Sequence, residues 1–298
     1  RKISNYIIKK VAESLKKLFK KDREKYEQIW EDVGLFIKYG CVSDTKFDEL
    51  MRDKVIFKNA ENKYMTLGEY RESIPTEFQD KLKEKVLYCE KNQSNGTVRK
   101  QLLESSIQSI ETDDHIDPHF IQHVETNKQE DQTLQFTSVE SEVANLLSTE
   151  NTTDTDIKIK DLFTNILSPV AEVTKEEEDK TPEDPSKLEV IIEKIKNSTS
   201  PAYIKFDEQM KRFNRMTLHM SNNSFPLKKT LVINPGHPLI QNAMKIHETG
   251  KNEELVKKIC HHVEDLANIS SEGLNADSKD LFVQRSQELI QDLTNFAV

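Results

Sequence analysis

Apolar residues recur every three or four positions through the first fifty residues. Over residues 3–18 this spacing, with lysines on the other side, predicts an amphipathic helix. A second helix is predicted around Trp30, with Gly40 placed to end it in a left-handed conformation. A third is predicted over residues 44–51, with Asp44 as its N-cap. The chain therefore opens on a helical block.

Beyond residue 70 the pattern changes to short β-like runs, separated by segments long enough to hold helices. The helix that follows Asp117 has a good start, because a carboxylate can accept from first-turn amides and Pro118 fits the first helical position. This alternation predicts a small α/β layer. Strands are expected at residues 85–89, 106–110 and 133–139, and helices at 98–103 and 118–124.

The last part of the chain mixes both patterns again. An alternating apolar run at residues 188–195 predicts a strand, and the turn Asn234-Pro235-Gly236-His237-Pro238 predicts the start of a new helix. Helices are expected near residues 156–167, over 201–220, and at the end over 253–267 and 280–295. No internal repeat is present.

Taken together, these elements predict an α+β (α/β) fold in two domains, because 298 residues exceed the roughly 150 that one compact core usually serves. We place the domains at residues 1–147 and 148–298. Residues 173–185 lack enough apolar surface to fold alone, and we expect them to form an exposed acidic loop.

Composition narrows the classes of partner. The chain carries 43 basic and 52 acidic residues, a net charge of −9 with both signs interleaved, so nucleic acid is not an expected partner. No apolar run approaches the ~20 residues that cross a bilayer, so a membrane is not expected either. Cys41, Cys89 and Cys260 are odd in number and far apart, which favours buried thiols in a reducing compartment, the cytoplasm.

The two final helices carry a broad apolar stripe. Two short helices at a chain end have little of their own domain left to cover such a surface, so we expect them to pack against the same pair from a second copy. The alternative is that they complete the core of their own domain. The residues assigned to this interface are Ile259, Val263, Leu266, Phe282, Val283, Ser286, Leu289, Ile290 and Leu293.

A second stripe consists of methionine and aromatic residues. Phe206, Met210 and Phe213 occur at i, i+4 and i+7 of the expected 201–220 helix, and Met216 continues them. Unbranched, polarizable side chains can repack around dissimilar apolar surfaces, which suits low-specificity binding of non-native polypeptide. The alternative is an ordinary core stripe.

Catalytic and metal-binding motifs are weak by comparison. Possible ligands are densest around His119 and His123, which lie four apart on a predicted helix, but the glutamate of a His-Glu-x-x-His motif is absent. No phosphate loop, Gly-x-Ser-x-Gly or Gly-x-Gly-x-x-Gly occurs among only seven glycines. A zinc site remains a minor alternative, and neither a metal nor a catalytic residue is expected. The other members of this cluster are Asp113, Asp114 and His115.

Several longer stretches occur in a recognisable order, among them Trp30-Glu31-Asp32-Val33 and Ile116-Asp117-Pro118-His119. With the Asn234 to Pro238 turn, they resemble the middle and C-terminal domains of the heat shock protein 90 family of the bacterial HtpG type. The resemblance covers nearly the whole chain, and residues 126–200 diverge most. The matching stretches are residues 1–12, 30–33, 36–40, 64–70, 116–123, 232–240 and 282–290.

This resemblance implies an ATP-dependent molecular chaperone that binds unfolded or partly folded client proteins and works as a homodimer. ATP and Mg would bind an N-terminal domain, and both that domain and a catalytic-loop arginine would precede Arg1. We therefore expect no ATP hydrolysis by this chain alone and no cofactor within it. The competing hypothesis is a non-enzymatic dimeric scaffold that keeps the fold without chaperone activity.

The resemblance also assigns roles to residues. Phe206, Met210 and Phe213 fall on the client-binding helix of the C-terminal domain, with Met216 beside them. A second client surface in the middle domain maps to the helix that carries His119 and Gln122. The two final helices would form a four-helix bundle with those of a second protomer.

Overall fold

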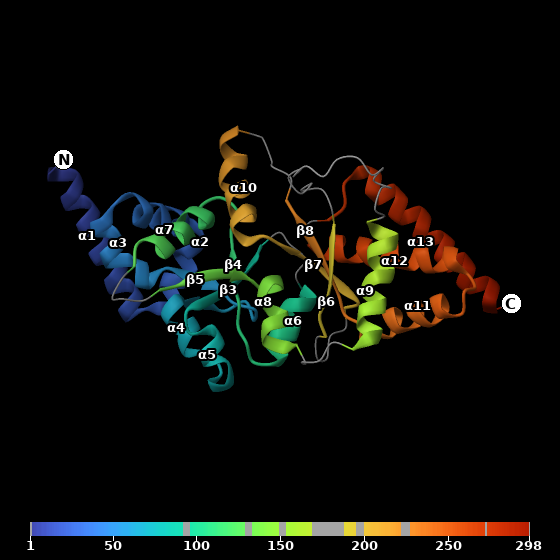
Figure 1. Ribbon diagram of the computed structural model, residues 1–298. Helices are drawn as coiled ribbons and strands as arrows, with labels where there is room; N and C mark the ends of the chain where they lie inside the picture. The colour runs from blue at the N-terminus through green and yellow to red at the C-terminus, as the bar shows by residue number, and fades with distance from the viewer. Residues whose placement is uncertain are drawn as a thin grey trace, which may run out of the picture. The chain divides into compact units, whose positions relative to one another are not determined.

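The computed structural model describes residues 2–91, 96–128, 133–148, 153–168, 188–194, 200–221, 227–271 and 273–297. These divide into an N-terminal unit and a C-terminal unit, and helices α6 and α10 contribute residues to both (Figure 1). A mixed α+β chain was expected and is confirmed. The acidic segment 173–185 lies outside the described residues, and the domain boundary at residue 147 stays a prediction.

The N-terminal unit combines helices with two small sheets. Its elements are α1 (Lys2–Lys21), α2 (Arg23–Ser43), α3 (Thr45–Met51), η1 (Arg52–Lys54), β1 (Ile56–Lys58), β2 (Tyr64–Thr66), α4 (Leu67–Glu72), η2 (Thr76–Phe78), α5 (Gln79–Leu82), β3 (Lys85–Glu90), β4 (Ile110–Thr112), α7 (Asp117–Thr126) and β5 (Gln135–Ser138). Helix α6 (Gly96–Glu104) follows β3 along the chain. The helices predicted before residue 51 are confirmed.

The end of α2 differs from the prediction. Asp44 does cap α3, accepting a 2.8 Å hydrogen bond from the amide of Phe47. Gly40, however, does not terminate α2, which continues to Ser43. A Cβ at this glycine would lie 2.8 Å from the ring of Phe47. Gly40 is therefore required for the close approach of α3 and not for a left-handed turn.

The larger sheet of the N-terminal unit is parallel, in the order β4-β3-β5. Its central strand β3 is buried, as a parallel strand should be. The strand predicted at 106–110 begins only at Ile110, because Ser106 has a positive φ of 60° and turns the chain. Asp117 is not an N-cap. It instead accepts the amide of Asp113 at 2.7 Å and pairs with the buried Lys38 at 2.5 Å.

The C-terminal unit surrounds a three-stranded sheet in the order β6-β8-β7, with β6 parallel and β7 antiparallel to β8. The helices α9, α11 and α12 contribute to one core with the inward side chains of all three strands. Figure 1 shows these helices beside the sheet. The elements are α8 (Val139–Leu147), α9 (Asp154–Leu167), β6 (Glu189–Ile192), β7 (Ala202–Phe206), α10 (Glu208–Ser221), β8 (Lys229–Ile233), α11 (Pro238–Glu248), α12 (Glu253–Ser271) and α13 (Ala276–Ala297).

The helix predicted over 201–220 is wrong in its first part. Residues Ala202–Phe206 form strand β7, and α10 begins at Glu208. In β7, Ile204 and Phe206 point into the core, two residues apart, and the strand pairs with β8. Alternate residues of this segment are buried once it pairs with a strand more than twenty residues later in the chain. This pairing therefore makes the segment a strand, although its apolar spacing predicted a helix.

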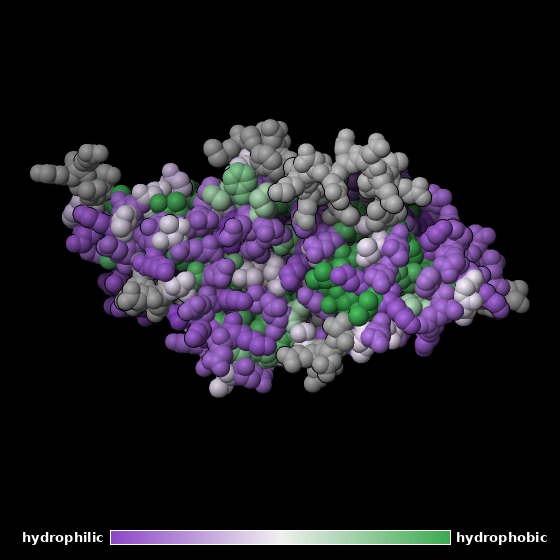
Figure 2. Space-filling view, viewed as in Figure 1, coloured by the Kyte–Doolittle hydropathy of each residue, from purple (hydrophilic) through white to green (hydrophobic). Residues whose placement is uncertain are grey.

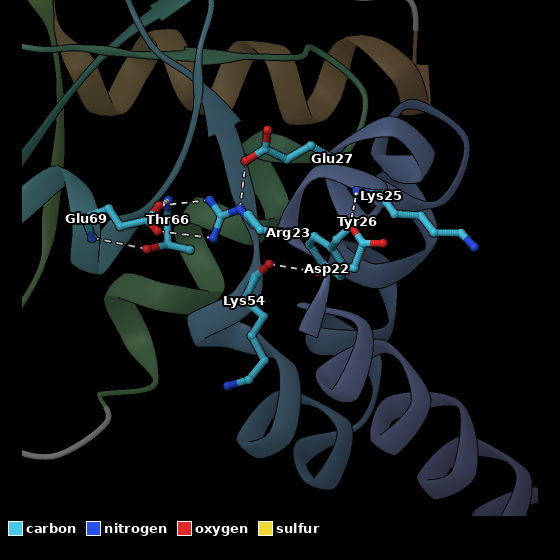
Figure 3. Close-up of polar contacts among 8 residues, drawn as sticks. All are labelled: Asp22, Arg23, Lys25, Tyr26, Glu27, Lys54, Thr66 and Glu69. Carbon is cyan, nitrogen blue, oxygen red and sulfur yellow. Dashed lines mark hydrogen bonds and ion pairs between the residues drawn. The ribbon is translucent and has the colours of Figure 1, made fainter. Parts of the chain in front are cut away.

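A polar network joins α2 to the elements that follow it (Figure 3). Arg23 donates to Glu27 at 2.7 Å and to both carboxylate oxygens of Glu69 at 2.9 and 3.1 Å. Glu69 in turn accepts the amide of Thr66 at 2.7 Å and completes the capping box of α4. This network fixes the start of α4 against α2.

We expect Tyr26→Phe to destabilise the protein. Tyr26 is fully buried, and its hydroxyl donates a 2.8 Å hydrogen bond to the carbonyl of Lys54. Without the hydroxyl that carbonyl has lost its donor, which costs about 1–2 kcal/mol in the free energy of unfolding. Urea unfolding measures the change. Tyr39→Phe, at a side chain 61% exposed, is the matched control, and an equal loss in both variants would contradict the assignment.

Candidate functional site

The last helix is held to α12 by a narrow contact that we call the α12–α13 seam. Lys258 pairs with Glu288 at 3.1 Å and with Asp292 at 3.2 Å. The hydrogen bond from Lys258 lowers the pKa of Glu288. The seam consists of Lys258, His262 and Asp265 on α12 and of Phe282, Arg285, Glu288 and Asp292 on α13.

The middle of the seam is an ion pair and a ring stack. Arg285 pairs with Asp265. One turn away, the ring of His262 lies parallel to that of Phe282, with centroids 5.2 Å apart and planes 7° apart. Sequence analysis missed these contacts. Their signal was the i, i+3 and i+4 spacing of polar residues with opposite charges on the two final helices.

Helix α13 leaves its other side uncovered. Val283, Ile290 and Leu293 are 51%, 61% and 69% exposed, and their spacing places them with Ser286 on one face. We call Val283, Ile290 and Leu293 the outer face of α13, and Ser286, which lies among them, is half-buried. Large aliphatic side chains at such exposure on one helix form an apolar patch on the surface of the unit.

The nine residues predicted for the dimer interface separate into three groups. Val263 is fully buried in the core of its own unit, so the expectation of a free interface residue is wrong there. Ile259 packs partly against that core. The stripe could not distinguish the two roles, because a helix that faces its own core and one that faces a partner share the same period. The half-buried group is Leu266, Phe282, Ser286 and Leu289, and the exposed group is Val283, Ile290 and Leu293.

Helix α10 exposes apolar side chains and buries polar ones, the reverse of an ordinary surface helix. Met210 and Phe213 are 44% and 50% exposed, whereas Lys211, Arg212 and Asn214 are buried. A surface helix ordinarily turns its apolar side inward. The reversal leaves a methionine and a phenylalanine at the surface, and Figure 2 shows hydrophobic residues exposed over α10 and, more extensively, over β6 and α9.

The other residues predicted to contact clients differ in position and exposure. Phe206 is buried at 9% exposure in β7, where the ammonium groups of Lys211 and Lys229 lie 5.4 and 5.7 Å from its ring centre, so we no longer assign it to a binding surface. Met216 is half-buried on α10. His119 is half-buried and Gln122 exposed on α7, and their role stays a prediction.

The acidic and histidine cluster at residues 113–123 makes separate contacts. Asp113 accepts the amide of His115 at 2.9 Å, and His123 lies 3.1 Å from Asp48 of α3. Across the part of the chain that the structure describes, no three His, Cys, Asp or Glu side chains gather as a metal site. The three cysteines are buried and free, as expected, and burial raises the pKa of Cys41 and Cys260 to about 12.

Comparison with known proteins shows the family to which this chain belongs. A family model described as Hsp90 protein matches residues 1–297, and the chain belongs to this family. It is similar to the chaperone protein HtpG of Bacteroides thetaiotaomicron, with 26% identity over 86% of this chain and 37% of the relative. HtpG of Porphyromonas gingivalis is 27% identical over 91% of this chain and 39% of the relative.

The chain thus spans less than two fifths of the length of these relatives. HtpG of Clostridium botulinum is 33% identical over a shorter stretch of 100 residues. None of the described helices has the length and apolar character that a membrane span needs.

The division of the stripe into core and outer face predicts different effects of truncation. Val263→Ala removes two methyl groups from a closed core and should lower the free energy of unfolding by about 2 kcal/mol. Leu281→Ala, at a side chain 57% exposed and off the outer face, should change it by less than about 0.5 kcal/mol. Chemical denaturation followed by circular dichroism measures both. Similar losses would show that the division is incorrect.

Proposed function

We propose that this chain is the client-binding and dimerising part of a cytoplasmic, ATP-dependent molecular chaperone. The observation that carries the proposal is the uncovered outer face of α13, in a chain whose similar relatives are named chaperone protein HtpG. ATP and Mg would bind outside this chain, which by itself would not hydrolyse ATP.

The partner of the outer face is a second copy of the chain. A two-fold axis would place the α12–α13 pairs of two protomers together as a four-helix bundle, each burying the outer face of the other. Each aliphatic side chain that is fully removed from water contributes about 1.5–3 kcal/mol. Val283, Ile290 and Leu293 would become buried in both protomers. That gain is of the size required to offset the entropy of association.

The client surface is the exposed side of α10. Met210 and Phe213 present a flexible and an aromatic side chain, with Met216 beside them, and such side chains adapt to guests of different shape. Dimerisation would hold two copies of this surface at high effective concentration, so that weak contacts act together. His119 and Gln122 on α7 stand as a second client contact.

A dimeric scaffold without chaperone activity is the other candidate. Such a scaffold would need the outer face of α13 as much as a chaperone does, because that face serves only to form the dimer. It would give no reason for α10 to bury Lys211 and Arg212 while Met210 and Phe213 are exposed. The reversed polarity of α10 therefore favours the chaperone.

We expect Ile290→Asp with Leu293→Asp to convert the dimer into a monomer. Two carboxylates in each outer face would have to be buried without partners, which should weaken dimerisation by about a hundredfold or more. Sedimentation equilibrium gives the mass directly. Leu281→Asp introduces a carboxylate on another side of α13 and should remain dimeric. A double variant that stays a dimer would remove α13 from the interface.

We expect Met210→Ser with Phe213→Ser to leave the dimer intact and to weaken suppression of client aggregation. Loss of two apolar contacts should lower the apparent affinity for a non-native protein by about tenfold. Light scattering of chemically unfolded test protein, diluted into buffer with the chaperone, measures suppression. Leu281→Ser is the control for a general loss of surface hydrophobicity. Equal suppression by the double variant and wild type would exclude α10 as the client surface.

A further inference from the structure

His262 occupies an unusual position in the α12–α13 seam. Its ring stacks on Phe282, and its Nδ1 atom is buried with no hydrogen-bond partner among the described residues. Other histidines of the unit differ, since His261 lies 3.6 Å from Glu264 and His247 lies 3.1 Å from Glu253. The contact of His262 with Phe282 is thus made by the flat face of its ring, and this contact suits the neutral form of imidazole.

Burial is the main cause of this preference, and of the two charges that act on the ring the Asp265 carboxylate, which favours protonation, has a larger effect than the Arg285 guanidinium. Burial lowers its pKa, the Arg285 guanidinium acts in the same direction, and the Asp265 carboxylate opposes both. Among the described residues these two are the charged groups that act on the ring, and they are already paired with each other. A histidine whose pKa is lowered by folding stabilises the fold above its unfolded value of about 6.5, and that contribution is lost as the pH falls below it.

The stack also controls the rotation of α13. Phe282 lies at the edge of the outer face, directly before Val283 and one turn before Ser286. The hydroxyl of Ser286 is buried and has no hydrogen-bond partner among the described residues, so it does not anchor this turn. The ring stack, the Arg285–Asp265 pair and the two ion pairs of Lys258 together decide which side of α13 is turned outward.

We propose that His262 is a positioning residue of the dimer surface and acts only in its neutral form. Its stack on Phe282 holds α13 in the rotation that presents Val283, Ile290 and Leu293 to the second protomer. Proton uptake at acidic pH places a cation beside Arg285, loosens the seam and weakens the dimer. This inference rests on the proposed homodimer.

The test is the dissociation constant of the dimer, measured by sedimentation equilibrium on the whole chain at about pH 7.5 and about pH 5.5. Wild type should dimerise about tenfold more weakly at the lower pH. His262→Phe keeps an aromatic ring and cannot be protonated, so its dissociation constant should change by less than about twofold. His261→Phe, the neighbour on α12, should keep the wild-type response.

A permanent charge provides the converse variant. His262→Lys should weaken the dimer at about pH 7.5 by about the tenfold that acid produces in wild type. His262→Gln, also unable to titrate in this range, replaces His262→Phe if the larger ring prevents folding, as judged by circular dichroism. A monomeric wild type at about pH 7.5 would overturn the homodimer itself. A dimer whose pH response survives in the non-titrating variants would overturn only the role of His262.

Discussion

The C-terminal unit closes its core with α12, and this leaves α13 with only one side to bury. Val256, Cys260 and Val263 of α12 complete the apolar layer between the sheet and its helices. Nothing in that core requires α13, which therefore attaches by the polar seam and keeps aliphatic side chains in water. Removal of such surface from water is the main favourable term in association, so the proposed dimer would bury what the core of the unit leaves exposed.

The exposed apolar residues of α13 and α10 differ in chemistry. On α13 the exposed residues include Val283 and Ile290, whose β-branched side chains have few rotamers and fit one fixed complementary surface. On α10 they are Met210 and Phe213, and methionine changes shape at low cost. Stiff side chains suit a constant partner, such as an identical protomer, and flexible ones suit many different guests. The assignment of dimer contact to α13 and client contact to α10 follows from this contrast.

Sequence periodicity predicted the elements better than it predicted which side chains are exposed. The helical spacing found α1, α12 and α13, and the cap at Asp44 was correct because its contacts are local. Phe206 was misplaced because its strand is only five residues long and depends on pairing with distant β8. Val263 was assigned to a partner surface although it lies in a core, because both environments select the same apolar residue at the same period.

The polar seam can fix the orientation of α13 on α12 without attaching α13 strongly. Ion pairs at a surface, such as those of Lys258 with Glu288 and Asp292, contribute little to stability, yet they match only one alignment of the two helices. An apolar seam would hold α13 more tightly and would tolerate several rotations. In the proposed dimer, such a weak but selective seam would align α13 within one protomer, and the second protomer would stabilise it further. Docking of α13 and dimerisation are then coupled, so anything that changes the seam also changes the dimer.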